Sequence, residues 1–204
     1  MGTRNLTVVM LDQKPVVAQY GQWDGYPKGQ GYTVLEFLRK VKLDKFKEKL
    51  KNVRFVDETD EKQIKEFLES IGCRDGWMTS EQAAKYHEKY PYMSRDHGAN
   101  ILDLIMKSKG EVLLNNSIDF AGDSLFCEWA YLIDLDKNVL EVYEGFNHQP
   151  LEEGQRFKDM PLGDYSGMDQ YYPIRCVKTY PLDNLPTDED FVKELEPKEE
   201  EEEE

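Results

Sequence analysis

The side chains best suited to recognising another molecule are concentrated between Tyr20 and Gly31, in the sequence Y-G-Q-W-D-G-Y-P-K-G-Q-G, which we call the aromatic loop. Its aromatic residues offer flat faces together with N–H and O–H donors, and its acid and amide side chains offer further hydrogen-bonding groups. This combination is typical of a site for a small polar ligand or for a protein partner. The candidate binding residues in the loop are Tyr20, Gln22, Trp23, Asp24, Tyr26, Gly29 and Gly31.

The aromatic loop could instead be a packed structural corner, in which Trp23 fills the core and Asp24 caps a turn. Its glycines lose more backbone freedom on folding than other residues do, so ordering them requires either a special backbone path or a close approach to something. Tight turns alone would explain the glycines equally well. We favour binding, because a structural corner would have to satisfy every one of these polar groups internally.

A second candidate group is Arg95 and His97, in the sequence S-R-D-H-G at a predicted helix start. An arginine, an acid and a histidine at a helix N-terminus could bind an anion or exchange a proton. The commoner role is structural, with Asp96 as a helix cap and Arg95 as a surface charge. We count Arg95 and His97 among the candidate binding residues and assign them no reaction.

Residue spacing gives no support for a metal or a cofactor. The three histidines are spread along the chain, and the three cysteines include no C-x-x-C pair. Acidic residues gather around a late hairpin, but they lack the twelve-residue pattern of a calcium loop, so we interpret them as solvated edge charge. These residues are Glu128, Asp134, Asp136, Glu141 and Glu144. We predict no metal and no cofactor.

The chain is acidic, with a formal net charge of −15. Its end, Pro197 to Glu204, holds one lysine and six glutamates and contributes −5, which leaves −10 for the remainder. A negative net charge of this size disfavours binding to the phosphate backbone of nucleic acid, so we predict no nucleic-acid partner. No apolar run approaches the roughly 18 residues of a membrane span, and no apolar signal segment opens the sequence. We expect a cytoplasmic protein with free cysteines and no membrane partner.

A predicted β-hairpin positions the aromatic loop. Asn5 to Leu11 and Val16 to Tyr20 are rich in β-branched and apolar residues, and a D-Q-K-P turn separates them. The second strand leads directly into the aromatic loop, which therefore lies at the end of a sheet. Beyond it, Thr33 and Glu36 form a capping box that starts a helix. A glycine-rich loop entering a helix N-terminus points free N–H groups at its own residues, and an anion could dock there.

Helical periodicity dominates the middle of the chain, where Gly72 is expected to end one helix and Thr79 to cap the next. The last third returns to strands, with a second hairpin around residues 136–138. The predicted fold class is α+β: an antiparallel sheet built from the N- and C-terminal hairpins, with the middle helices packed against it. We predict one globular domain over residues 1–196 and a disordered acidic tail over residues 197–204.

Much of the sequence resembles an uncharacterised family of proteins from phages, prophages and bacteria. The resemblance rests on M-G-T-R-N-L-T-V-V at the start, V-A-Q-Y-G-Q-W-D-G-Y-P-x-G-Q-G, F-C-E-W-A-Y-L-I-D-L-D and L-E-V-Y-E-G-F. The aromatic loop is its most specific part. The resemblance implies a phage setting, host-cell cytoplasm as the location and, as a hypothesis, an accessory role against a host system. It implies no particular chemistry.

The predicted topology is also similar to the opening of N-terminal-nucleophile hydrolases, in which a Thr, Ser or Cys at the mature N-terminus attacks an amide. Thr3 would be that nucleophile, with Arg4 or Asp24 as a neighbour. Removal of Met1 alone leaves Gly2 first, so a further cleavage would be required. We therefore expect a non-catalytic binding protein for a small polar ligand or a host protein, with this type of amide hydrolase as the alternative.

Overall fold

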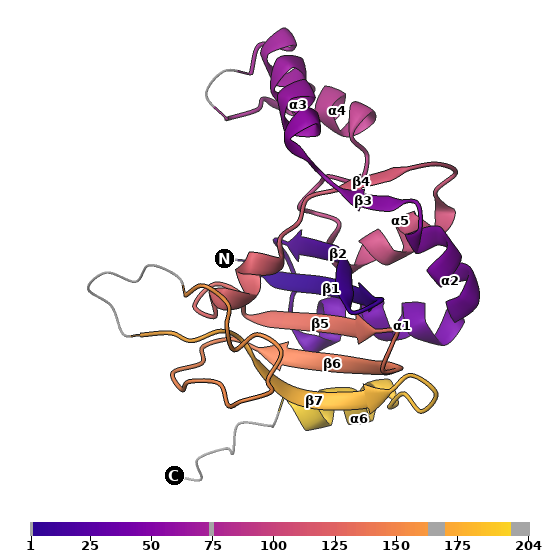
Figure 1. Cartoon of the computed structure of the whole chain (residues 1–204), viewed down its shortest axis with the longest axis vertical. Helices are drawn as coiled ribbons and strands as arrows, with labels where there is room; N and C mark the ends of the chain where they lie inside the picture. Colours follow the sequence, from indigo (N-terminus) through magenta and orange to yellow (C-terminus); the bar gives the residue numbers. More distant parts are fainter. Residues whose placement is uncertain (1, 74–75, 163–169, 197–204) are drawn as a thin grey trace, which may run out of the picture.

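The computed structural model describes residues 2–73, 76–162 and 170–196 (Figure 1). The strands are β1 (Asn5–Leu11), β2 (Lys14–Gly21), β3 (Val53–Phe55), β4 (Val112–Leu114), β5 (Trp129–Asp134), β6 (Val139–Glu144) and β7 (Arg175–Pro181). The α-helices are α1 (Tyr32–Lys40), α2 (Leu43–Leu50), α3 (Glu58–Ser70), α4 (Ser80–Lys89), α5 (Ile101–Lys107) and α6 (Asp188–Leu195). Shorter helical turns are η1 (Pro27–Gly31), η2 (Gly98–Asn100) and η3 (Ile118–Gly122). The predicted acidic tail lies outside the described residues.

The main sheet joins the two ends of the chain in the strand order β2-β1-β5-β6-β7. The N-terminal hairpin supplies β1 and β2, and the C-terminal strands supply the rest; α1 to α5 lie between them in sequence, and α6 follows β7. The predicted α+β class is therefore confirmed. A separate small sheet pairs β3 with β4.

The sheet is mixed, so the prediction of an antiparallel sheet is wrong in one respect. The two hairpins meet through β1 and β5, which run parallel, with Asn5 opposite Trp129. The other neighbours in the sheet are antiparallel. Two strands can run parallel only when a long connection carries the chain back to the starting edge, and the helical middle of this chain is such a connection.

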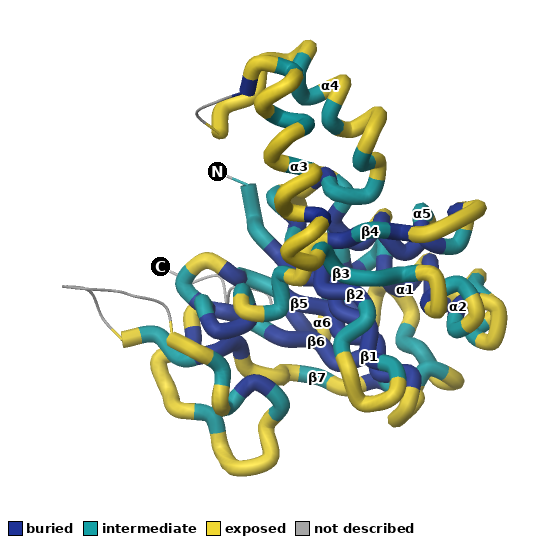
Figure 2. The backbone as a smooth tube through the Cα atoms, turned by 45° about the horizontal axis from the view of Figure 1, so that its top comes forward, coloured by how far each residue is buried: buried dark blue, intermediate teal, exposed yellow. Residues whose placement is uncertain are grey.

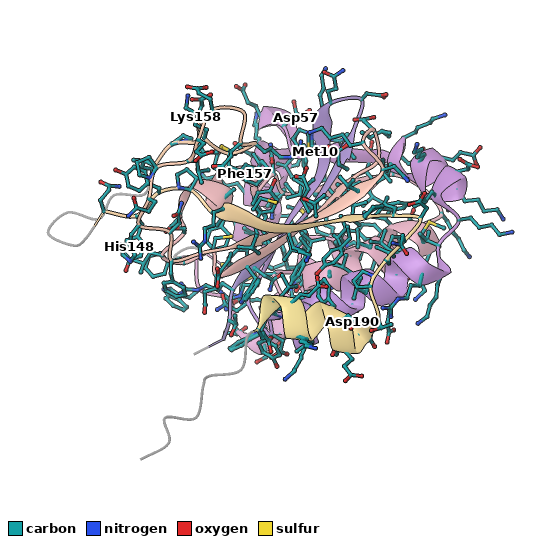
Figure 3. All side chains as sticks on the ribbon, turned by 90° about the horizontal axis from the view of Figure 1, so that it is seen from below. Met10, Asp57, His148, Phe157, Lys158 and Asp190 are labelled. Atoms are coloured by element: carbon teal, nitrogen blue, oxygen red, sulfur yellow. The ribbon has the colours of Figure 1, made fainter. Side chains whose placement is uncertain are left out.

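Both faces of the sheet are covered, because alternate residues of each central strand point to opposite sides. Val9, Tyr131 and Ile133 pack with the helices, whereas Val8 and Leu132 pack under described loop residues that precede β5 or follow β6. Figure 3 shows this layering: Asp190 of α6 lies on one side of the sheet, and Phe157 and Lys158 lie on the other. Burial on two faces explains why β1 is almost continuously apolar.

Helices α3 and α4 form an arm, which we define as residues 58–89, that projects away from the sheet (Figure 1). Most of the described arm is exposed or half-buried (Figure 2). The side chain of Arg54 ties its base to the body, because it donates to the carboxylates of Asp60 and Glu111. The two predicted helix signals in the arm are confirmed: Gly72 follows α3 with a φ of +83°, and Thr79 caps α4.

Candidate functional site

The aromatic loop leaves β2 at one end of the main sheet, as predicted. Asn5, on the neighbouring strand β1, fixes the exit, because its amide nitrogen donates to the carbonyls of Gly21 (3.3 Å) and Trp23 (3.2 Å). The N–H of Gly25 donates to the carbonyl of Thr3 (2.9 Å). Tyr131 of β5 is buried in the core, and its hydroxyl donates to the Gly25 carbonyl (2.9 Å). The loop backbone from Gly21 to Gly25 is therefore held by Asn5 of β1, by Thr3 just before it and by Tyr131 of β5.

The tightest point of the loop is the approach of Gly29 to Asp24. Asp24 has a φ of +55°, a conformation that costs a non-glycine residue free energy and is often found at functional sites. Its carbonyl accepts from the N–H of Gln30 (2.8 Å), and a Cβ on Gly29 would lie 2.1 Å from that same oxygen. Gly29 is therefore required by close backbone approach. Gly31 is buried, with the rings of Tyr131 and Phe191 around it.

The predicted capping box of Thr33 and Glu36 is wrong. Helix α1 begins at Tyr32, directly after the π-helical turn η1, and no side chain caps it. The hydroxyl of Thr33 donates back to the Gly29 carbonyl (3.4 Å). Because the chain is already helical before α1, the N–H groups of Gly29 and Gln30 are used within the loop, where the carbonyls of Tyr26 and Asp24 accept them. These two amides are not available to an anion.

The segment Ser94–His97 packs against the aromatic loop and brings the second candidate group to it. The N–H of Gln22 donates to the Arg95 carbonyl (3.1 Å), and Nε1–H of Trp23 donates to the carboxylate of Asp96 (3.1 Å). Arg95 thus contributes its backbone carbonyl to this contact, and its side chain is exposed. The Nε2–H of His97 donates to the Pro91 carbonyl (2.8 Å), which gives this ring a local structural role.

Asp96 is the residue that sequence reasoning missed at this site. It stands between two candidate residues in S-R-D-H-G, a position that favours a helix cap. The helical turn η2 begins only at Gly98, so Asp96 is free to accept from Trp23 instead. The signal in the sequence was an acid next to candidate residues; its tryptophan partner lies 73 positions away and could not be foreseen.

The aromatic side chains of the loop divide into one that is packed and two that are exposed. Tyr20 packs edge-on against Phe120, its hydroxyl donates to Gln22 (2.7 Å), and burial raises its pKa. The side chain of Trp23 is 50% exposed and that of Tyr26 is 38% exposed. The hydroxyl of Tyr26 donates to the carboxylate of Asp24 (3.3 Å), whose negative charge raises the pKa of Tyr26.

Other loops at this end of the sheet add two further exposed aromatic side chains. The register places Gly21, Asn5, Trp129 and Glu144 side by side, so the loops adjoining these residues meet at one end. Phe126 is 40% exposed and Phe146 is 52% exposed. We call Trp23, Tyr26, Phe126 and Phe146 together the aromatic end.

The residues before β1 also lie at this end. Gly2 contacts the ring of Trp23, since a Cβ on Gly2 would lie 2.2 Å from it. The guanidinium of Arg4 lies over the Phe126 ring, 4.4 Å from its centre, and its backbone N–H donates to Glu128 (3.1 Å). Thr3, the nucleophile of the hydrolase alternative, is partly buried between these residues and is tied to Gly25 through its carbonyl.

Two cavities border η1. One of about 950 Å³ lies between η1 and α6 and is lined by Lys28, Tyr32 and Lys193 among others. The second, of about 310 Å³, lies between η1, α1 and η2 and is also lined by Lys28 and Tyr32. Neither is lined by Trp23, Asp24 or Tyr26. The side chains of Trp23 and Tyr26 are instead exposed at the surface.

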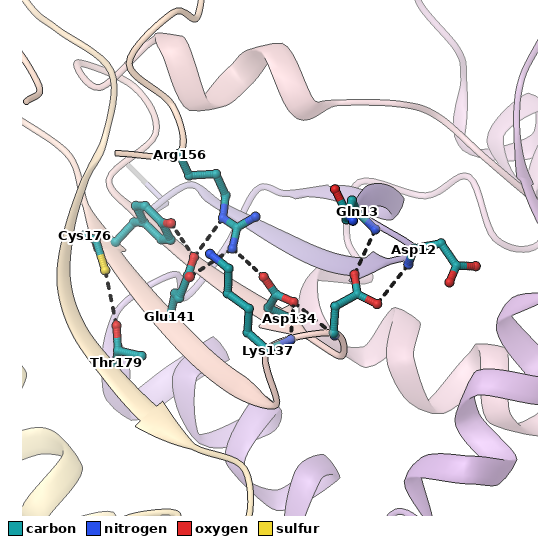
Figure 4. Close-up of polar contacts among 10 residues, drawn as sticks. Asp12, Gln13, Asp134, Lys137, Glu141, Arg156, Cys176 and Thr179 are labelled. Carbon is teal, nitrogen blue, oxygen red and sulfur yellow. Dashed lines mark hydrogen bonds and ion pairs between the residues drawn. The ribbon is translucent and has the colours of Figure 1, made fainter. Parts of the chain in front are cut away.

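A separate polar cluster lies on the loop-covered face of the sheet (Figure 4). Arg156 donates to Asp134 (2.6 Å) and twice to Glu141 (2.9 Å each), and the hydroxyl of Tyr143 also donates to Glu141 (2.5 Å). Burial alone would raise the pKa of Asp134, but donation from the Lys137 N–H and from Arg156 holds that pKa below its ordinary value.

For Asp134 and Glu141, the interpretation as solvated edge charge is wrong. Both carboxylates are buried and paired with Arg156, and no local pattern in the sequence connects Arg156 with them. In the described part of the chain, no group of three or more histidine, cysteine, aspartate or glutamate residues has an arrangement that could hold a metal ion.

No family model, curated protein or solved structure matched this chain when it was compared with each of these three sets. Every helix in the described ranges is too short or too polar to cross a membrane.

Proposed function

We propose that this chain is a non-catalytic binding protein that holds a partner protein on its aromatic end. The observation that carries the proposal is the state of Trp23: its ring is half exposed, while its Nε1–H is held by Asp96 and its carbonyl is held by Asn5 and Gln30. A tryptophan already fixed in place loses little conformational freedom when a partner covers it. Buried tryptophans and tyrosines contribute most of the binding energy in many protein interfaces.

A protein partner fits this surface better than a small polar ligand. Small ligands bind in concave sites that enclose most of their surface, whereas the cavities beside η1 are lined by neither Trp23 nor Asp24. The exposed rings come from three different loops at one end of the sheet. A set of aromatic side chains spread over several loops suits a broad protein surface.

The negative charge of the chain favours a partner with a basic surface. The chain carries a net charge of −15, and the carboxylates of Asp24 in the aromatic loop and of Asp96 in the adjoining segment lie next to exposed rings. A basic protein surface would be attracted over long range and could pair with these carboxylates on contact. The sequence resemblance to phage and prophage proteins supports a host protein as that partner and an accessory role against a host system.

Site-specific photo-crosslinking in bacterial cells tests the proposal. A photoreactive phenylalanine analogue would replace Trp23 in one variant and Phe146 in another. A matched control would carry the analogue at Leu162, which is 46% exposed and lies outside the aromatic end. We expect both aromatic-end variants to crosslink the same basic protein and the control variant to leave it unlabelled.

Crosslinking that is equal at all three positions would contradict the proposal, and so would two unrelated products from positions 23 and 146. A partner identified in this way then allows affinities to be measured with purified proteins.

A further inference from the structure

A third cavity, distinct from the two beside η1 and from the aromatic end, lies on the opposite face of the sheet from the helices. It has a volume of about 280 Å³ and lies between β6, β7 and the segment from Leu151 to Phe157. Its walls include the apolar side chains of Leu151, Phe157 and Ile174 and the thiol of Cys176. Its polar residues include Lys137, Glu141 and Arg156, which belong to the cluster in Figure 4 or adjoin it.

The carboxylate oxygens at this cavity are already occupied by donors. One oxygen of Glu141 accepts from Tyr143 and from Nε of Arg156, and the other accepts from Nη2 of Arg156. One oxygen of Asp134 accepts from Nη2 of Arg156, and the other accepts from the backbone N–H groups of Asp136 and Lys137. These acids therefore have little remaining capacity to recognise a donor.

Several donors at the same cavity are uncommitted. The ammonium of Lys137 and Nη1 of Arg156 have no hydrogen-bond partner within the described ranges. The side-chain amide nitrogen of Gln155 also has no hydrogen-bond partner among the described residues, whereas its side-chain oxygen accepts from the N–H of Glu152 (2.9 Å). Figure 4 shows the Lys137 side chain extending beside Arg156 toward Glu141. A ligand that supplies acceptors would satisfy these groups.

We propose that this cavity binds a small carboxylate that has an apolar body. The carboxylate pairs with Lys137 and with the free Nη1 of Arg156, as carboxylates do with ammonium and guanidinium groups. The apolar body lies against Leu151, Phe157 and Ile174. The volume lies near the lower limit for ligand pockets, about 300 Å³, so the ligand is short.

The thiol of Cys176 provides a reporter inside the cavity. It is the exposed cysteine, whereas Cys73 and Cys127 are buried. Iodoacetate and iodoacetamide differ mainly in charge, and both react with the thiolate, so the ratio of their rates at Cys176 does not depend on the thiol pKa. Peptide mass spectrometry of the full-length protein assigns the label to its cysteine.

We expect Lys137→Gln to lower the iodoacetate-to-iodoacetamide rate ratio about three- to fivefold, as the loss of one partly exposed ion pair would. Lys178→Gln is the matched control, because Lys178 is two residues from Cys176 but pairs with Glu194 on the helix side. We expect it to leave the ratio unchanged. Arg156 is not substituted, because its loss would leave two buried carboxylates unpaired.

A second measurement uses 3-phenylpropionate, a short carboxylate with an apolar body, as the probe. We expect it to protect Cys176 from iodoacetamide in a saturable manner, and its alcohol analogue to give no protection. The proposal requires both results. It is overturned if Lys137→Gln and Lys178→Gln change the rate ratio equally, or if phenylpropionate protects no better than the alcohol.

Discussion

The aromatic loop and the α3–α4 arm both expose a tryptophan, but of these two indole N–H groups only that of Trp23 donates a hydrogen bond to another described residue. Trp23 is 50% exposed and its indole N–H is bonded to Asp96, whereas Trp77 is 90% exposed at the far end of the arm. Many polar contacts of the loop are to residues distant in the chain, such as Asn5, Arg95 and Tyr131. The arm is joined to the body mainly at its base, through Arg54.

This difference teaches that exposure alone is weak evidence for a binding site. The chain keeps Asp24 in a left-handed conformation and requires a glycine at position 29 in order to hold the loop in one shape. Backbone strain of this kind persists only where the surrounding contacts fix it, and it is concentrated at functional sites. We therefore propose the loop, and not the arm, as the element that binds a partner.

The largest effect on stability is expected for Gly29→Ala. Its new methyl group would lie 2.1 Å from the Asp24 carbonyl oxygen, so the backbone of the loop would have to move. We expect the free energy of unfolding to fall by about 2–3 kcal/mol. In the arm, Gly76 has a φ of +77° but open space around it, so Gly76→Ala should cost only about 1 kcal/mol. Urea unfolding measures both, and equal losses would contradict a uniquely constrained loop.

Acid should weaken the attachment of the arm to the body, because protonation of Asp60 weakens its pairing with Arg54. Hydrogen bonds from Arg54 lower the pKa of Asp60 to about 2. Because this folded-state value is depressed, the stabilisation is complete above the ordinary carboxyl pKa of about 4 and is lost as the pH falls from about 4 to about 2. We expect hydrogen exchange at the start of α3 to accelerate in this range, after correction for the intrinsic rate.

The control for the acid response is Asp60→Asn, which removes the titrating group. It should exchange faster than the wild type at neutral pH and show a smaller change on acidification. An unchanged pH response in this variant would mean that Asp60 does not anchor the arm.

The smallest effects on stability are expected for the two exposed tryptophans. Trp23→Ala and Trp77→Ala should each change the free energy of unfolding by no more than about 1 kcal/mol, because neither ring fills the core. Thermal and urea unfolding of the two variants would check this. A much larger loss for Trp23→Ala would mean that the loop is a structural corner, the alternative considered for it from the sequence.

Local patterns in the sequence predicted the parts of the fold that depend on neighbouring residues. The hairpin of β1 and β2, the loop that follows it, and the helix signals at Gly72 and Thr79 depend on residue types within a few positions. The capping box at Thr33 failed because the π-helical turn before it had no recognisable pattern.

Features that depend on distant contacts could not be predicted. The parallel pairing of β1 with β5, the bond from Trp23 to Asp96 and the pairing of Arg156 with Asp134 and Glu141 each join residues far apart in the chain. Composition indicated that the aromatic loop was unusual. Which of its rings face solvent followed only from the three-dimensional packing.

The most direct test of the central claim is the affinity of the crosslinked host protein for purified Trp23→Ala and Trp77→Ala variants, measured by titration calorimetry at fixed salt. If the aromatic loop is the binding element, Trp23→Ala should weaken binding about 30-fold or more, as loss of an interface anchor does. Trp77→Ala should bind like the wild type. Equal affinities for both variants, or a larger loss for Trp77→Ala, would contradict the assignment of binding to the aromatic loop.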